Sequence, residues 1–441
     1  MDAVALAFVD PAGVTLVKCV PTRRFEEAVR FGIGLSPVFS VFLFDDQITS
    51  SPQIGGPTGD TRLMPDPDRT VALAASPGWA MAPVDQVDQD GEPYPACPRT
   101  FARRMLDRLG RKGLELQGGY EVEFFLGHRL PLGPEGEPDP EPAHRGPAYG
   151  AIALADVEPF ATDLIRAFET QGTGLMQFHP EYSTGQLELS VPHETGIGVA
   201  DTNLVVRHTI RAVARTHGLA ASFAPVVYPD LVGNGLHLHL SLWNRRGRNL
   251  FQGGRGPEGM TREAEAFTAG VLDSLHALTA ITAPSVASYQ RLQPHRWSGP
   301  WACWGRENRE AALRFITGMT GNRPQAANLE VKSMDGSANP YLALGAVVAA
   351  GLDGIERELS LPAPVLDDPA SISTRRRNSM GIHQLPSSLG AAIGHLDAST
   401  VLREAMGDVL FDAYLATRRA EREAYEDQDP AAIVRAHRWR Y

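Results

Sequence analysis

The spacing of apolar and polar positions divides the chain into two parts. Near its start, apolar runs at residues 4–9 and 14–20 flank a turn sequence at residues 10–13, and this pattern predicts a β-hairpin. Residues 50–98 are rich in Gly, Pro and Asp with little helical periodicity, whereas residues 99–116 are amphipathic and basic. The predicted domains are residues 1–97 and residues 98–441.

Helical and strand-like patterns follow one another through the larger domain, which predicts an α+β fold. Apolar residues three and four apart predict helices over residues 159–172 and 201–218, with Asp201 at the N-cap of the second and Gly218 beyond its end. The Pro- and Gly-rich residues 127–150 are expected to form a surface insertion. The other predicted elements are strands over residues 119–126, 186–191 and 236–242, and one long charged helix over residues 401–425.

Composition limits the classes of function. With 441 residues the chain exceeds one ordinary core, and 43% hydrophobic with 21% charged residues is typical of a soluble globular protein. A net charge of −11 without long runs of like charge argues against a nucleic acid or a membrane as partner. The three Cys residues lie far apart and form no CxxC sequence, which predicts a reducing, cytoplasmic location.

Carboxylates alternate with apolar residues in the strand predicted over residues 119–126. Glu121 and Glu123 share one face of this strand, and Val122 and Phe124 share the other. Two adjacent carboxylates repel each other unless a cation lies between them, and hard divalent cations are the usual partners. The alternative is a solvated face of an edge strand.

Histidines repeat this alternation further along the chain. His237, His239 and Ser241 lie on one face of a predicted strand whose other face carries leucines. Glu330 and Lys332 also share a face. The alternative is a pair of ordinary histidines whose hydrogen bonds are satisfied within the fold.

A third group of candidate residues combines acids and bases. Glu181 and Glu188 bracket a turn, and four arginines occur within a Trp-rich segment. Carboxylates that bind metal ions and arginines that bind phosphate are the two requirements of phosphoryl transfer, although a solvated ion-pair surface would explain the arginines equally well. The arginines are Arg291, Arg306, Arg309 and Arg314.

Six motifs, in this order along the chain, resemble those of the glutamine synthetase family. The resemblance implies a small N-terminal β-grasp-like domain and a larger catalytic domain with a curved antiparallel sheet, as in glutamine synthetases and guanidino kinases. It also implies an ATP-dependent ligase that joins glutamate to an amine through a γ-glutamyl phosphate. The motifs are Glu121-Val122-Glu123; His179-Pro180-Glu181 with Gly185-Gln186-Leu187-Glu188; Gly233-Asn234-Gly235 before His237-Leu238-His239-Leu240-Ser241; Tyr289-Gln290-Arg291-Leu292; Glu307-Asn308-Arg309 with Arg314; and Glu330-Val331-Lys332 before Ala338-Asn339-Pro340-Tyr341.

The resemblance implies a role for each matching residue. Oxygen-rich ligand sets with one imidazole suit Mg²⁺ or Mn²⁺. One metal ion is expected at Glu123, Glu181 and Glu188, and a second at Glu121, His237 and Glu330. ATP is expected at His239, Ser241, Arg309 and Arg314, with Arg309 also catalytic, and glutamate at Gly233, Arg291 and Lys332.

The base that deprotonates the amine is, in this family, an aspartate from the N-terminal domain of a neighbouring subunit. Counting back from Asp60 gives Asp46 as the matching residue here, with Asp45 as the alternative. A site shared between subunits implies a homo-oligomer, two stacked hexamers in this family.

The sequence departs from glutamine synthetases in the segment that closes over the ammonium site. Residues 291–300 contain no carboxylate, so an ammonium ion loses a ligand. Trp297, Trp301 and Trp304 offer surface to an amine with a carbon chain, although three tryptophans would equally suit an ordinary core. Lys332 also stands where the family has an arginine. We therefore expect an organic mono- or polyamine as acceptor. The alternatives are a glutamine synthetase that uses ammonium, a guanidino kinase and a non-catalytic ring protein.

Overall fold

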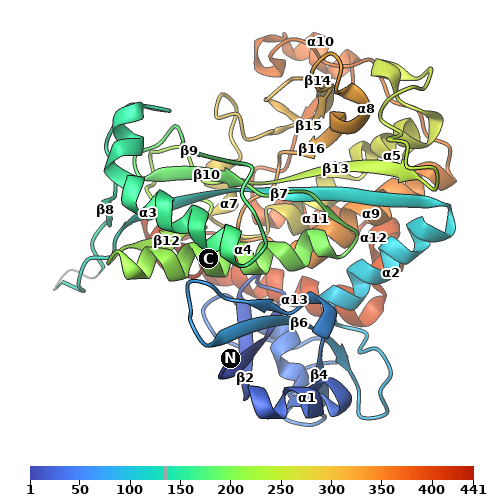
Figure 1. Ribbon diagram of the computed structural model, residues 1–441. Coiled ribbons are helices and arrows are strands. Elements are labelled where there is room, and N and C mark those ends of the chain that lie inside the picture. The colour runs from blue at the N-terminus through green and yellow to red at the C-terminus, as the bar shows by residue number, and fades with distance from the viewer. Residues whose placement is uncertain (134–136) are drawn as a thin grey trace.

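A computed structural model describes residues 1–133 and 137–441. Within these residues the strands form two sheets, one of six strands and one of eleven. Figure 1 shows the smaller sheet at one end of the molecule, with a layer of helices between it and the larger sheet. The predicted α+β class, with a small N-terminal β domain and a larger second domain, is confirmed. The boundary at residue 97 stays a prediction.

The smaller sheet has the order β2-β1-β6-β4-β3, and β5 pairs with β6. β1 and β2 are antiparallel, as the predicted hairpin requires, whereas β1 and β6 are parallel. Ala28 of the helix α1 (Phe25–Phe31) packs with Leu6 and Leu63 in the core of this domain. The strands are β1 (Ala3–Val9), β2 (Thr15–Pro21), β3 (Ile33–Leu35), β4 (Thr61–Pro65), β5 (Val71–Ala72) and β6 (Trp79–Val87).

The larger sheet has the order β17-β14-β15-β16-β13-β7-β10-β9, with β8, β11 and β12 also paired to β7. The predicted strands correspond to β7, β10 and β13. The sheet is antiparallel as expected except for β14 and β15, which are parallel. Its strands are β7 (Leu114–His128), β8 (Glu141–Pro142), β9 (Gln177–Pro180), β10 (Gln186–Ser190), β11 (Glu194–Thr195), β12 (Ala220–Ser222), β13 (Leu236–Asn244), β14 (Trp301–Arg306), β15 (Ala311–Ile316), β16 (Asn328–Val331) and β17 (His383–Gln384).

Helices cover one face of the larger sheet, and α2 and α4 pack directly against β7. The helices are α1 (Phe25–Phe31), α2 (Pro98–Arg111), α3 (Ala151–Thr170), α4 (Gly198–Thr216), α5 (Arg262–Asp273), α6 (Leu275–Thr282), α7 (Ser288–Arg291), α8 (Arg323–Ala326), α9 (Pro340–Glu356), α10 (Thr374–Ser379), α11 (Leu389–Asp397), α12 (Thr400–Met406), α13 (Asp408–Tyr425) and α14 (Pro430–His437). Short 3-10 helices lie at Thr22–Arg24, Pro37–Val41, Pro67–Arg69, Pro257–Gly259 and Pro369–Ser371.

The helix predicted to start at residue 159 begins eight residues earlier, so Pro159 lies inside α3. A proline in a helix removes one backbone hydrogen bond, but Val157, Phe160 and Leu164 are buried here, and their packing outweighs that loss. Because α3 begins at Ala151, the surface insertion predicted over residues 127–150 corresponds to the segment that joins β7 to α3. Its residues 134–136 lie outside the described part of the chain.

Two helix ends also differ from the prediction. α4 begins at Gly198, so Asp201 is not an N-cap but a buried residue of the first turn; Gly218 has φ +68° beyond the helix end, as predicted. The long C-terminal helix is interrupted at Gly407, whose φ of +79° separates α12 from α13. A positive φ cannot continue a right-handed helix.

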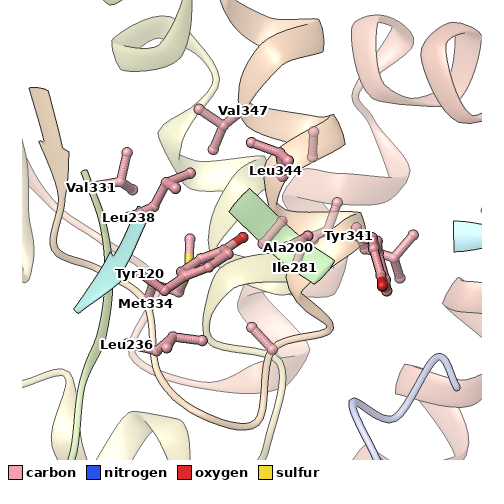
Figure 2. Packing of buried hydrophobic residues seen from close by; sticks show 14 of the residues in the cluster. Tyr120, Ala200, Leu236, Leu238, Ile281, Val331, Met334, Tyr341, Leu344 and Val347 are labelled. Atoms are coloured by element: carbon pink, nitrogen blue, oxygen red, sulfur yellow. The ribbon is translucent and has the colours of Figure 1, made fainter. Parts of the chain in front are cut away.

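The apolar side of the larger sheet packs against α4, α6 and α9 to form the main core. Figure 2 shows Tyr120, Leu238 and Val331, from three neighbouring strands, facing Leu344 and Val347 of α9. All five side chains are buried. Because side chains alternate along a strand, this packing determines that the residues between them point away from the helices.

Buried ion pairs join the two domains. Arg99, at the start of α2, is 2% exposed and donates two hydrogen bonds of 2.9 Å to Asp201 of α4. The same guanidinium lies 2.7 Å from Asp66 and 3.0 Å from Asp85 of the N-terminal domain. The hydroxyl of Tyr341 donates to Asp201 at 2.7 Å. One buried arginine therefore links carboxylates of both domains, and Arg69 and Arg103 pair with the same carboxylates.

Across residues 1–133 and 137–441, no helix combines the length and the apolar character needed to cross a membrane.

Candidate functional site

The alternation within β7 separates a core face from a functional face. Val122 is buried against the helices, so Glu121 and Glu123 point to the opposite side. His237 of β13 is directly opposite Glu121, and Glu188 of β10 is directly opposite Glu123. Pairing of the strands therefore brings together residues that are about sixty-five to one hundred and sixteen positions apart.

The row of opposed side chains continues on both sides. Glu330 of β16 lies opposite His239 of β13 and Arg314 of β15. On the other side, His179 of β9 lies opposite Glu188 of β10. Carboxylates, imidazoles and an arginine from consecutive strands thus occupy one face of the sheet.

A cavity of about 650 Å³ lies at this row. Most of the site residues predicted from the sequence line it, whereas Glu330, His239 and Ser241 lie beside it in the sheet. Asp46 is elsewhere in the molecule. The predicted residues that line the cavity are Glu121, Glu123, Glu181, Glu188, Gly233, His237, Arg291, Trp297, Arg309, Arg314 and Lys332.

The Glu121 cluster consists of Glu121, His237 and Glu330, the three residues expected at one metal ion. One possible ligand atom from each lies within 4.8 Å of the others. Nδ1 of His237 is 2.8 Å from Oε1 of Glu121 and 3.3 Å from Oε1 of Glu330. Burial raises the pKa of Glu121, but the hydrogen bond with His237 and the nearby imidazole charges outweigh it and lower that pKa to about 2. Glu121 is therefore ionised and able to bind a cation.

Glu330 is also held in its ionised form. The side chain is 1% exposed, and burial by itself raises its pKa. Lys332 donates to it at 3.0 Å and Arg314 at 2.8 Å, and these cations together with the two histidines hold the pKa of Glu330 well below its usual range.

The Glu188 cluster consists of His179, Glu181 and Glu188, which again offer three ligand atoms within 4.8 Å. Nε2 of His179 is 3.1 Å from Oε1 of Glu188. His179 was not among the predicted ligands, although it belongs to the His-Pro-Glu motif, which was the signal that could have identified it. Glu123, which was expected at the same metal ion, lies directly opposite Glu188 in the sheet, and its place among the ligands stays a prediction.

Glu123 lies between the two clusters. Its Oε2 accepts hydrogen bonds from the side chain of Gln186 at 2.9 Å and from the backbone N–H of Gly235 at 2.7 Å. Its Oε1 is 3.7 Å from Nε2 of His237. One oxygen of Glu123 is thus used to fix the carboxylate, and the other faces the gap between the clusters.

The donor set fits divalent cations. Burial, and after it the charges of the neighbouring carboxylates, raises the pKa of Glu188 to about 8 despite the hydrogen bond with His179. Oxygen ligands with one or two imidazoles are the set that Mg²⁺ and Mn²⁺ accept. Among the described residues, the buried Nε2 of His239 has no hydrogen-bond partner and lies 3.7 Å from Glu121. A cation at this position would reduce the repulsion that the sheet pairing creates.

Gln186 and Tyr149 are further residues at the cavity that sequence reasoning did not assign. Gln186 bridges Glu123 and the carbonyl oxygen of Gly233, which it contacts at 3.0 Å. Tyr149 comes from the Pro- and Gly-rich insertion, has φ +56°, and donates its hydroxyl to Glu181. An insertion read as surface gives no pattern that would place a tyrosine at a cavity on another part of the fold.

Gly233 and Arg291 lie next to each other, as a shared substrate site requires. A Cβ atom on Gly233 would be 1.9 Å from the carbonyl oxygen of Pro225, so no larger residue fits there. Arg291 is 3% exposed, and its Nη2 is 3.1 Å from Nε2 of His237. The arginine therefore approaches the Glu121 cluster from the cavity side.

Ser241 and His239 face the strand neighbours more than the cavity. The hydroxyl of Ser241 accepts a hydrogen bond of 2.9 Å from the indole of Trp243. Nδ1 of His239 is 3.0 Å from the side-chain oxygen of Asn328. Their expected contact with a nucleotide stays a prediction.

Asp45 and Asp46 are outside the cavity of their own chain. Oδ2 of Asp46 accepts a hydrogen bond of 2.7 Å from Arg440, and Oδ2 of Asp45 accepts one of 2.8 Å from Tyr425. Asp46 is 72% exposed and has φ +70°. Within a single chain Asp46 is therefore exposed to another subunit, whereas Asp45 is half-buried and also accepts hydrogen bonds from Gln47.

Comparisons with known proteins identify relatives along the whole chain. Residues 95–435 match the model of the glutamine synthetase catalytic domain, and residues 1–94 match that of the glutamine synthetase N-terminal domain. The gamma-glutamylpolyamine synthetase GlnA3 of Streptomyces coelicolor is 48% identical and covers 100% of this chain and 94% of its own.

Solved structures agree with these sequence matches. A crystal structure of a novel glutamine synthase homolog superposes with a TM-score of 0.87 at 35% identity, covering 100% of this chain and 98% of its own. A GmaS complex with ADP superposes with a TM-score of 0.83 at 30% identity, covering 97% and 95% of the two chains.

Proposed function

This chain belongs to the glutamine synthetase family, and on that premise we propose that it joins the γ-carboxylate of glutamate to an organic polyamine. As a family member it is an ATP-dependent carbon–nitrogen ligase, so the kinase and non-catalytic alternatives are not favoured. The observation that carries an organic amine is the segment over residues 291–300, which has no carboxylate and presents Trp297 to the cavity. The name of the Streptomyces relative supports a polyamine as this acceptor.

The reaction needs an activated carboxylate, because a free carboxylate is a poor acylating agent. The γ-carboxylate of glutamate attacks the γ-phosphorus of ATP, ADP leaves, and a γ-glutamyl phosphate results. The amine nitrogen then attacks the acyl carbon, inorganic phosphate leaves, and a base accepts the proton from nitrogen. Positive charge around the transferred phosphoryl group is the main catalytic requirement.

We assign roles to the cavity residues on this basis. Arg309 and Arg314 bind and neutralise the phosphates of ATP, with His239 and Ser241 near the nucleotide. Gly233, Arg291 and Lys332 bind glutamate, and Trp297 contacts the carbon chain of the amine. Metal ions supply further positive charge to the phosphoryl group when they are bound. The proposed ligands are Glu121, His237 and Glu330 for one Mg²⁺ or Mn²⁺, and Glu123, Glu181 and Glu188, with His179, for another.

The proton acceptor is proposed to come from a second copy of the chain. Asp46 lies outside the cavity of its own chain and is exposed, as a residue that serves a neighbouring subunit has to be. We propose a dodecamer of two stacked hexamers. Analytical ultracentrifugation that gives a monomer would contradict this and leave Asp46 without a role. The cytoplasmic location stays a prediction.

An amine panel tests the proposed function. Phosphate release is measured with ATP, Mg²⁺ and glutamate against ammonium, ethanolamine, ethylamine, butylamine, putrescine and spermidine. We expect the highest kcat/KM with a polyamine. Turnover with ammonium at low millimolar concentration and none with organic amines would instead identify a glutamine synthetase.

Asp230 provides a sharper test of polyamine recognition. This exposed carboxylate lines the same cavity as Trp297, where it can meet the distal ammonium group of a diamine. We expect Asp230→Asn to raise KM for putrescine about fivefold, which corresponds to about 1 kcal/mol of a partly exposed ion pair. KM for butylamine, which has the same carbon chain and no second charge, should not change.

The matched control is Asp163→Asn, an exposed aspartate on α3 whose partners are Arg166 and His217. It should alter neither KM. Equal increases in KM for putrescine and butylamine with Asp230→Asn would show that Asp230 shapes the cavity and does not bind the second ammonium group of putrescine.

A further inference from the structure

The segment that carries Trp297 has an unusual backbone. His295 has φ +63° and Trp297 has φ +51°, so two residues with a Cβ atom adopt the left-handed region within three positions. Each such residue costs roughly 1 kcal/mol or more. Gly299 follows with φ +69°, where an added Cβ would be 2.8 Å from Cβ of Lys332. Other contacts must therefore stabilise this conformation.

Glu310 makes those contacts. Its carboxylate accepts a hydrogen bond of 2.8 Å from the backbone N–H of Trp297 and one of 3.3 Å from that of His295. Glu310 is 5% exposed, although it belongs to the segment between β14 and β15 and not to the loop itself. A buried carboxylate needs hydrogen-bond donors, and here each of its oxygens is satisfied by one strained residue of the loop.

The backbone conformation of residues 295–297 determines the position of the Trp297 indole. This side chain is 59% exposed, so packing against a core does not hold it in place. It lines the cavity, and the guanidinium of Arg309 lies 6.0 Å from its ring centroid. The ring therefore lines the cavity and has the guanidinium of Arg309 over one of its faces.

We propose that Glu310 is a positioning residue for the amine acceptor, because it holds residues 295–297 in the conformation that places the Trp297 ring at the cavity. This inference rests on the proposed function, since the ring is taken to contact the carbon chain and charge of an organic amine. Glu310 does not itself line the cavity. Its removal should change amine binding and leave the binding of ATP and glutamate unchanged.

The first measurement compares steady-state constants of Glu310→Ala with the unaltered enzyme. We expect KM for the preferred amine to rise about tenfold, equivalent to about 1.4 kcal/mol, with KM for ATP and glutamate within about twofold. Glu310→Gln keeps the shape and one acceptor oxygen, so it should restore part of the loss. Asp368→Asn is the control, because Asp368 approaches the loop at the His295 side chain, at 3.7 Å, and otherwise accepts a hydrogen bond from the backbone N–H of Ala370.

The second measurement is a double-mutant cycle with Trp297→Ala. If Glu310 acts through Trp297, the double variant should have nearly the same amine KM as Trp297→Ala alone. Additive effects would overturn the inference, as would an unchanged amine KM in Glu310→Ala. Should Glu310→Ala not fold, Glu310→Gln takes its place in the cycle.

The wild-type amine panel separates the two proposals. If the unaltered enzyme uses no organic amine, the proposed function fails before any variant is considered. If it uses organic amines and the Glu310 variants behave like the unaltered enzyme, only the positioning role fails.

Discussion

Glu121→Gln is expected to lower ATP-dependent phosphate release by at least about a thousandfold, equivalent to about 4 kcal/mol of transition-state stabilisation. The change keeps the size of the side chain but replaces a charged oxygen ligand with a neutral amide. Glu121 is 2.8 Å from His237 at the centre of the Glu121 cluster, where a full negative charge is available to a divalent cation. Calorimetric titration with Mg²⁺ or Mn²⁺ should show a parallel loss of metal affinity.

Glu115→Gln is the matched control for this experiment. Glu115 lies six residues earlier on the same strand, and therefore on the same face of β7, but it is exposed and far along the strand from the clusters. It should retain full activity. Near-normal turnover of Glu121→Gln would contradict the assignment of Glu121 as a metal ligand.

Arg99→Ala is expected to lower the free energy of unfolding by about 3–5 kcal/mol, because it leaves the buried Asp201 carboxylate with the more distant Arg69, at 3.5 Å, as its counter-charge. Asp201 is 3% exposed and would keep a single hydrogen bond from Tyr341. Asp66 and Asp85 would lose their buried partner on α2 and keep the more exposed Arg103. Urea unfolding followed by circular dichroism and by tryptophan fluorescence measures the change and shows whether the domains separate first.

Arg103→Ala is the control for the domain junction. Arg103 pairs with the same Asp85, at 3.1 Å, but its side chain is 39% exposed. Exposed pairs contribute about 1 kcal/mol or less, so this variant should unfold close to the wild-type urea midpoint. Similar losses for the two arginines would show that burial does not set the strength of this junction. The double variant Arg99→Met with Asp201→Asn should recover part of the loss.

The local sequence was sufficient to predict those elements whose structure depends on the pattern of neighbouring residues. The hairpin of β1 and β2 and the strands β7, β10 and β13 were predicted because their side-chain alternation matches a sheet with one buried face. The errors occurred where distant residues decide. α3 continues through Pro159 because its apolar face is buried, and Asp201 lies inside α4 because Arg99 binds it there.

The sequence by itself determined the family, the α+β class and the chemical nature of the site. Glu121, His237 and Glu330 could be identified because polar and apolar side chains alternate in their strands and the motifs follow one another in the order typical of the family. Only the tertiary structure decided how these residues combine. Strand register brought His179 into the Glu188 cluster and placed Glu123 between the clusters. The physical reason is that hydrogen bonding between strands and burial of one sheet face fix distances that spacing along the chain does not contain.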